Sequence, residues 1–551
     1  MNVNFTPPSK ACHNCRRRRW KCDRSLPVCQ KCLSSGTECL GYNKLFVWNN
    51  GVASRGKMMG KSFEGTKGLS ISKVHSQEPT PTPPPERNEL VILKRTINAE
   101  RGSLFTDDAS PILDYVYHAS SVVQWPLVDP LVQDLDVHSR YYVYHFANQL
   151  TVDMVVFDGP DVSNPIRDMI PAIAGHPMLL QVILANSAFH VFNISRDPIT
   201  PSMYQEYQKP CLFSYYRDVT RFGGPFKSSY VDALVAKQEA LSLLSQSVAA
   251  VHPSNIDFVL LSILLFINYD LVESGRDKWK VHMEGAKRLI KLMGTPRYQQ
   301  HPMTTLRQCL LADLLVFSVL GSTMTHAAGC ERLTPKSIDL EPILQYAETN
   351  NYLSCPAPLL RIMLRSFELP DTRDSPVMEV SSEIQEEVRQ LLEDALAFDP
   401  KAWAKTFRPA SPLEDLEMRA RIAAAHRSAV CIYIARVLTD NNPLINPSSP
   451  SVLVSLTGLA DDIISHVSKL HPSDPVFKCI SWPLFLAGAE TVDPTQRTWI
   501  MNKLDELYGV MYWGYIRTVK AVLERIWAVK DDGRGCWVIG VKEMGEELLI
   551  A

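Results

Sequence analysis

The 551-residue sequence lacks a hydrophobic run long enough to cross a bilayer, because its most apolar stretch, residues 258–267, covers only half of the roughly 20 residues that a spanning helix needs. That stretch contains Ser262, and we expect it to form a buried helix, with no membrane as a partner. Residues 1–10 have no apolar core of the kind found in secretory signals, so we expect a reducing compartment. The composition, with 46% hydrophobic and 21% charged residues, excludes a globally disordered chain.

Sequence patterns of enzymes are also missing. The chain has no G-x-S-x-G, no H-E-x-x-H, and no G-x-G-x-x-G after a strand-like segment. Residues 51–57 nearly match the phosphate-binding pattern G-x4-G-K, but Met58 stands where that loop needs Ser or Thr. His326, Cys330 and Glu331 could ligate a metal ion, but no second cluster of ligand residues accompanies them in the sequence. We therefore predict that the protein is not an enzyme.

Charge is nearly balanced over the whole chain, at -2, but it is unevenly distributed. Residues 1–61 hold twelve Lys and Arg against two acids, Asp23 and Glu38, whereas residues 62–551 carry an excess of twelve acids. Affinity for nucleic acids depends largely on neutralising phosphates with Lys and Arg. The asymmetry therefore predicts that only the N-terminal segment contacts a polyanion.

Six of the thirteen cysteines fall within 28 residues, with the spacing C-x2-C-x6-C-x6-C-x2-C-x6-C. Two C-x2-C pairs are typical of thiolate ligands around a tetrahedral metal, and soft sulfur ligands favour zinc. Two zinc ions need eight ligand positions, so six sulfurs suffice only if two of them bridge. The similarity of the two halves makes the first cysteine of each half the natural bridge, and a disulfide framework or an iron–sulfur site remains an alternative. The predicted ligands are Cys12, Cys15, Cys22, Cys29, Cys32 and Cys39.

Between the second and third cysteines, residues 16–21 contain five cations, whereas the matching loop of the second half, residues 33–38, contains none. This difference predicts that the first half faces DNA and that the second half serves as scaffold. A short helix starting near Cys15 would present arginines to a groove, where a guanidinium can bond guanine O6 and N7 as a bidentate pair. The alternative is that the basic run is only a nuclear-import signal or a solvated face.

The segment 11–40, with Cys15-Arg16, Lys21-Cys22-Asp23-Arg24 and Pro27 before Cys29, resembles the binuclear zinc cluster of the fungal zinc-cluster transcription factors. The resemblance implies two Zn2+ ions shared by six cysteines and recognition of CGG triplets in double-stranded DNA. It also implies base contacts from Arg18 and Arg19 and phosphate contacts from Arg16 and Lys21. The residues that follow resemble a subgroup that includes the acriflavine sensitivity control proteins.

The chain is expected to contain three regions: a zinc cluster at 1–45, a basic arm and proline-rich linker at 46–109, and a large all-α domain at 110–551. The last region has helical periodicity, and three of its segments resemble the all-helical regulatory domain of the same family. These segments are residues 164–167 followed by an apolar helix, residues 279–290, and residues 482–488 with Arg497. One expected helix buries Trp279, Met283, Ala286, Ile290 and Met293, exposes Lys280, Glu284, Lys287, Arg288 and Lys291, and ends at Gly294; a second buries Ile384, Val388, Leu391, Ala395 and Phe398.

The predicted function is a nuclear, sequence-specific transcription factor of RNA polymerase II genes, with DNA and the transcription machinery as partners and a homodimer left open. Relatives suggest a pathway-specific role in a secondary-metabolite gene cluster or in drug resistance. Two alternatives remain: a zinc-gated or redox-gated interaction module that does not bind DNA, and an enzymatic body fused to a DNA-binding head.

Overall fold

The computed structural model describes part of the N-terminal segment and most of the remainder of the chain. The described residues are 10–12, 15, 16, 18–25, 29–35, 39, 130–159, 162–196, 228–276, 278–299, 303–322, 333, 338–366, 369, 382–438, 441–531, 537–543 and 548–551. The predicted arm and linker, the near-match at 51–58 and the group at 326–331 lie outside these residues. The chain divides into two compact units, Met1–Lys94 and Arg95–Ala551, called the head and the body below. The domain boundaries drawn at residues 45 and 109 stay predictions.

The described secondary structure is helical throughout, which confirms the predicted fold class of a small cluster domain followed by a large all-α domain. Within the described residues the only β-type pairings are isolated bridges, Val155 with Asn351 and Arg276 with Leu548. The elements are α2 (Gln30–Ser34) in the head and, in the body, α5 (Val137–His145), η2 (Phe146–Leu150), α6 (Thr151–Asp153), α7 (Pro165–Asp168), η3 (Ile170–Gly175), α8 (Pro177–Ser195), α10 (Ser229–Ala249), α11 (Ile256–Glu273), α12 (Trp279–Met293), α13 (Pro296–Gln299), α14 (Thr305–Ser322), α15 (Glu341–Asn350), α16 (Ala357–Ser366), α17 (Ser382–Ala397), α18 (Pro400–Thr406), α19 (Leu416–Ala435), α20 (Leu456–Val467), η6 (Pro475–Ile480), α21 (Ser481–Glu490), α22 (Pro494–Met511), α23 (Tyr515–Asp531) and α24 (Trp537–Glu543).

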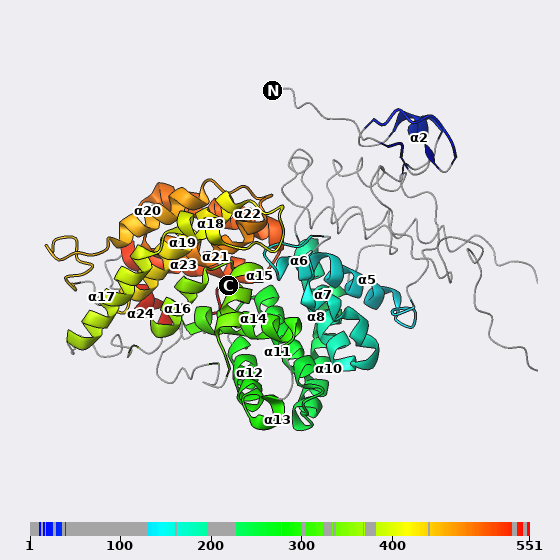
Figure 1. Ribbon diagram of the computed structural model, residues 1–551, viewed down its shortest axis with the longest axis horizontal. Coiled ribbons are helices and arrows are strands. Elements are labelled where there is room, and N and C mark those ends of the chain that lie inside the picture. Colours follow the sequence, from blue (N-terminus) through cyan, green and yellow to red (C-terminus); the bar gives the residue numbers. More distant parts are fainter. Residues whose placement is uncertain are drawn as a thin grey trace, which may run out of the picture. The chain divides into compact units, whose positions relative to one another are not determined.

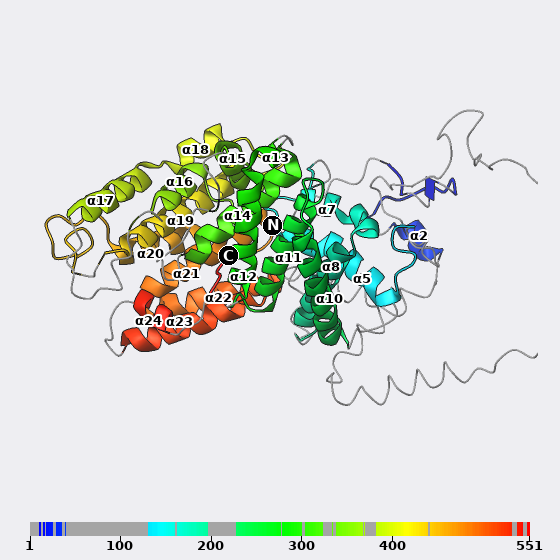
Figure 2. The same ribbon diagram turned by 90° about the horizontal axis from the view of Figure 1, so that it is seen from below.

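Within the body, the helices α5 to α10 lie on one side and α17 to α24 on the other, with α11 and α14 between them (Figures 1 and 2). Helices α8 and α10 pack together, α11 packs against α8 and α12, and α19 packs against α20 and α21. Helix α11 is buried on all faces from Val259 to Leu271, which confirms the buried helix predicted over 258–267. A helix that is apolar all round belongs in the core of a large fold.

The expectation that no segment is long and apolar enough to cross a bilayer was wrong, because helices α8 and α14 have the length and composition of a membrane-spanning helix. Their apolar windows are nevertheless 78% and 72% buried inside the body. Their hydrophobic surface is therefore used in packing against other helices.

The two predicted helical stripes are confirmed at their centres and corrected at their edges. In α12 the five predicted core residues are buried and Gly294 caps the end, and in α17 Val388, Leu391 and Ala395 are buried. Ile384 and Phe398, which were predicted to be buried, are only partly buried, and so is Lys280 of α12, which was predicted to be exposed. The prediction that Lys287 is exposed was wrong, because only 7% of it is accessible. Lys287 lies one turn after Met283, at the edge of the buried face, and its ammonium reaches out to Glu284 at 2.7 Å while its stem stays covered.

The three segments expected to belong to a regulatory domain make packing contacts in the body. Arg167 in α7 forms a bidentate pair with Asp158, at 2.9 and 2.8 Å. The Trp279 ring presses on Gly321 so closely that a Cβ there would lie 2.1 Å from it, which explains why glycine is needed at this point. Trp482 is completely buried. These contacts hold the helices of the body together.

Candidate metal centre and nucleic-acid interface

The first half of the head is a single helical turn closed by hydrogen bonds on both sides of the basic loop. The N–H of Arg16 donates to the Cys12 carbonyl at 2.9 Å, and the N–H of Trp20 donates to the Cys15 carbonyl at 2.8 Å. A third bond, from the Arg19 N–H to the Arg16 carbonyl at 3.3 Å, completes the pattern of a Schellman helix end. Arg19 accordingly has a left-handed backbone, with φ of +55°. The turn therefore holds the arginines in a fixed backbone conformation.

The second half repeats the sulfur geometry of the first. Helix α2 begins after Cys29, whose Sγ accepts a hydrogen bond from the Cys32 N–H at 3.4 Å. In the first half the Sγ of Cys12 accepts from the Cys15 N–H at the same distance, 3.4 Å. Each C-x2-C pair is thus built in the same way, as the repeated spacing predicts.

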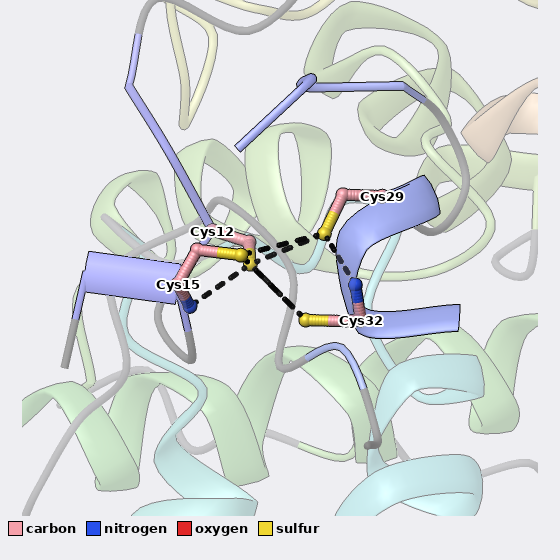
Figure 3. A group of neighbouring side chains, drawn as sticks. All are labelled: Cys12, Cys15, Cys29 and Cys32. Atoms are coloured by element: carbon pink, nitrogen blue, oxygen red, sulfur yellow. Dashed lines mark hydrogen bonds between the residues drawn. The ribbon is translucent and has the colours of Figure 1, made fainter. Parts of the chain in front are cut away.

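The sulfurs of these two pairs face one another and form one group (Figure 3). The Sγ atoms of Cys12 and Cys15 lie 3.6–3.8 Å from those of Cys29 and Cys32, and all four are within 4.8 Å of each other. A tetrahedral zinc site with Zn–S bonds of about 2.3 Å separates its sulfurs by about 3.8 Å. The donor set and its spacing therefore fit a zinc ion.

Burial favours the protonated form of the thiols in this group when no cation compensates them. All four cysteines are buried, and burial raises the pKa of the Cys12 thiol to about 12 and shifts the pKa of Cys15 and Cys29 in the same direction. Neighbouring buried thiolates are costly unless a cation compensates them, and a coordinated metal deprotonates its thiol ligands outright. Zinc binding would therefore be coupled to loss of the thiol protons.

The other two predicted ligands lie next to this group. Cys22 forms a second cluster with Cys29 and Asp23, and its sulfur accepts a hydrogen bond from the Cys12 N–H at 3.5 Å. Cys39 is half-buried and packs against the same core. Cys29 therefore belongs to both groups of potential ligands, and Cys12 contacts both. The number of ions stays a prediction, as does the bridging role of Cys12 and Cys29.

Asp23 links the two halves of the head, a role that sequence reasoning missed. Its carboxylate accepts hydrogen bonds from the N–H groups of Gln30 at 3.0 Å and Lys31 at 3.2 Å, at the start of α2, and from the Ser25 hydroxyl at 2.5 Å. These bonds, that of Ser25 first, hold the pKa of Asp23 well below its usual range. The signal for such a cap is normally an Asp immediately before the helix, and Asp23 is seven residues away from Gln30 in sequence.

The four predicted DNA contacts, Arg16, Arg18, Arg19 and Lys21, are all exposed on or just after the first turn. Trp20 orders part of this surface, since the Arg18 guanidinium lies 4.9 Å from its ring centroid and the Lys31 ammonium of α2 lies 5.7 Å from it. Lys31 thus brings a cation of the second half beside the basic turn, which the sequence analysis did not anticipate. The surface is a compact group of cations on a rigid turn.

Comparison with known proteins gives consistent matches along the chain. The model of the fungal specific transcription factor domain matches residues 140–551, and that of the fungal Zn(2)-Cys(6) binuclear cluster domain matches residues 10–48. The chain is similar to the acriflavine sensitivity control protein acr-2 of Neurospora crassa, with 28% identity over 95% of this chain and 93% of that protein. It is also similar to the phomenoic acid biosynthesis cluster-specific transcriptional regulator of Leptosphaeria maculans, with 19% identity over 94% of this chain and 85% of that protein. No solved structure matches.

Proposed function

Because the chain belongs to the fungal-specific transcription factor family and carries its Zn2Cys6 cluster domain, we propose that it is a sequence-specific DNA-binding regulator of RNA polymerase II genes that recognises CGG-type sites. The observation that carries the proposal is the basic turn between Cys15 and Trp20. Its hydrogen bonds fix the backbone, the Cys15 sulfur belongs to the group of four cysteines, and its described arginines are exposed to solvent.

In this proposal the residues divide between two tasks. Arg18 and Arg19 contact base edges in the major groove, while Arg16 and Lys21 contact phosphates and set the position of the head. No covalent chemistry is needed, and the protein is not an enzyme. Two zinc ions bound by six cysteines supply the folding free energy of a segment too small to bury a sufficient core.

The nucleus is the proposed location, and the transcription machinery is the proposed protein partner. The name of the Leptosphaeria relative points to a biosynthetic gene cluster and that of the Neurospora relative to drug sensitivity. Both support a pathway-specific regulator of secondary metabolism or drug resistance. A homodimer would bind two half-sites in a geometry set by the assembled protein.

The test is binding of the zinc-loaded full chain to duplexes with CGG triplets and to scrambled duplexes of equal length, at several salt concentrations. The proposal expects tighter binding to CGG at each salt concentration, and chromatin immunoprecipitation should find such sites upstream of one contiguous gene set. Equal affinity for both duplexes would contradict sequence-specific recognition. Zinc-dependent capture of a protein partner without any DNA binding would instead favour the interaction-module alternative.

A further inference from the structure

The last four residues of the sequence lie inside the body. Leu548, Leu549, Ile550 and Ala551, called the tail below, are each at most 1% exposed, and the C-terminal end lies within the body in both views (Figures 1 and 2). The tail is not helical: Leu548 makes an isolated antiparallel bridge with Arg276, and the residues after it have no regular secondary structure. A short extended segment held in this way resembles a bound peptide more than an element of a helical fold.

Two polar contacts fix the backbone of the tail. The N–H of Leu549 donates to the Gly275 carbonyl at 2.8 Å, and the Ser481 hydroxyl donates to the Ala551 carbonyl. Gly275 has φ of +71°, and a Cβ there would lie 2.7 Å from the carbonyl oxygen of Leu549. Glycine is therefore needed both for the left-handed backbone and for the close approach of the tail. Main-chain pairing together with burial of side chains is how proteins bind extended peptides.

The helices around the tail are held together by contacts that do not involve it. The N–H of Gly514, just before α23, donates to the Val272 carbonyl of α11 at 2.9 Å, and the side-chain amide of Asn193 in α8 donates to the same carbonyl at 2.8 Å. Helix α21, whose first residue is Ser481, packs against α23. Because these helices contact one another directly, we expect them to keep their positions when the tail leaves.

We propose that Gly275, Ser481 and the surrounding core form a peptide-binding site, which the tail occupies and which an extended apolar peptide of the same chemistry occupies in trans when the tail is undocked. Burial of the side chains of residues 548–550 supplies the affinity, and the hydrogen bond to Gly275 sets the register. A covalently attached tail has an effective concentration of about millimolar at its site, so it excludes weak competitors. The site goes beyond DNA recognition and does not depend on it.

The first experiment measures how readily the tail undocks in the full chain, by hydrogen exchange and mass spectrometry. The tail should exchange faster than the buried helix α11, because it opens locally while the core stays folded. Ser481→Ala removes the hydroxyl that bonds Ala551 and should speed exchange of the tail roughly 2- to 12-fold, the effect of one hydrogen bond. The matched control is Ser262→Ala, which changes another completely buried serine that bonds the Phe258 carbonyl within α11, and it should leave exchange of the tail unchanged.

The second experiment measures binding in trans by fluorescence anisotropy, with a labelled peptide that has the sequence of residues 545–551. Leu549→Glu in the full chain keeps its own tail undocked, because burying an unpaired charge is costly. This variant should bind the peptide, and the wild type should bind it about tenfold or more weakly, since its tail already occupies the site. The control peptide carries glutamate at the position of Leu549 and should bind neither chain.

Two results would overturn the proposal. If the tail of the wild type exchanges as slowly as α11, it is a fixed part of the core and not a docked peptide. If the Leu549→Glu chain is folded by circular dichroism and does not bind the peptide at millimolar concentration, the site does not accept a peptide in trans. If that variant is unfolded, the exchange experiment decides alone. Because no DNA is present, both outcomes are independent of whether the head recognises CGG sites.

Discussion

Replacing Arg19 with glycine separates two effects of this residue: the conformational free energy that its left-handed backbone costs, and the affinity that its guanidinium contributes to DNA binding. Arg19 has φ of +55° at the position after a helical turn where glycine is most common, because glycine has no Cβ to clash. A left-handed residue other than glycine costs about 1–2 kcal/mol, and the extra freedom of glycine in the unfolded chain offsets about 0.5–1 kcal/mol of that. Arg19→Gly should therefore leave the zinc-loaded head at least as stable as the wild type.

The same substitution should reduce binding to specific DNA. A bidentate contact between arginine and guanine contributes about 1–3 kcal/mol of discrimination, or roughly 5- to 150-fold in affinity. Fluorescence anisotropy of the full chain on CGG and scrambled duplexes at one salt concentration measures this directly. Arg19→Ala is the matched variant: it also removes the guanidinium but keeps a Cβ in the left-handed conformation.

The two variants give separate tests of the two roles. We expect both to lose the same affinity for CGG, and we expect Arg19→Gly to hold zinc more tightly than Arg19→Ala against a competing chelator. Equal losses on CGG and scrambled duplexes would show that Arg19 contacts only phosphate. Weaker zinc retention in Arg19→Gly than in Arg19→Ala would refute the reasoning about the left-handed turn.

Three further predictions concern the head and the core of the body. Cys29→Ser should lower the zinc content measured by mass spectrometry and abolish DNA binding, because Cys29 belongs to both ligand groups, and normal zinc content would contradict the two-ion proposal. Asp23→Ala should weaken zinc retention in a chelator titration more than Asp23→Asn, because the asparagine keeps an acceptor oxygen for the N–H groups at the start of α2. Equal zinc retention in the two variants would show that the hydrogen bonds of Asp23 do not stabilise the head. Burial raises the pKa of Asp313 to about 7, whereas the pKa of an aspartate in the unfolded chain is about 4. The protonated carboxyl therefore contributes its full stabilisation below pH 4, and this contribution is lost as the pH rises through 7. Between those two values the free energy of unfolding falls by about 1.4 kcal/mol per pH unit. Asp313→Asn should make the denaturation midpoint vary less with pH between 5 and 7, and an unchanged pH profile would show that this carboxyl is ionised in the fold.

The sequence predicted the grouping of the cysteine pairs in the head because the information for it is local. Cysteine spacing, the basic run and the repeat of the two halves are all contained in residues 12–39, and the structure assembles Cys12, Cys15, Cys29 and Cys32 as that spacing requires. The contacts that it did not predict cross between the halves. The bonds from α2 to Asp23 and the approach of Lys31 to Trp20 depend on how the two turns face each other, which no periodicity encodes.

In the body the sequence predicted which residues face the core but not how helices meet. The buried stripe of α12 follows from the helical period of 3.6 residues. The same period puts Lys287 at the edge of this stripe, where the methylene groups of its side chain are covered. Trp279 of α12 contacts Gly321 of α14 at a point where any side chain on residue 321 would clash with the indole ring. Such contacts depend on crossing geometry, for which a hydrophobic stripe is necessary but not sufficient.

The same physical difference explains why the grouping of the cysteines could be predicted and the contacts between distant parts of the body could not. A zinc domain of this size has too little core to fold without its metal, so its ligands must be close in sequence and their spacing carries the fold. The body has a large core and can bring together residues from any part of the chain. Asp153 and Trp513, for example, are 360 residues apart in sequence, and the indole N–H of Trp513 donates to the Asp153 carboxylate at 3.2 Å. Neither residue carries a local sequence signal of this contact, because it depends on how the helices of the body cross.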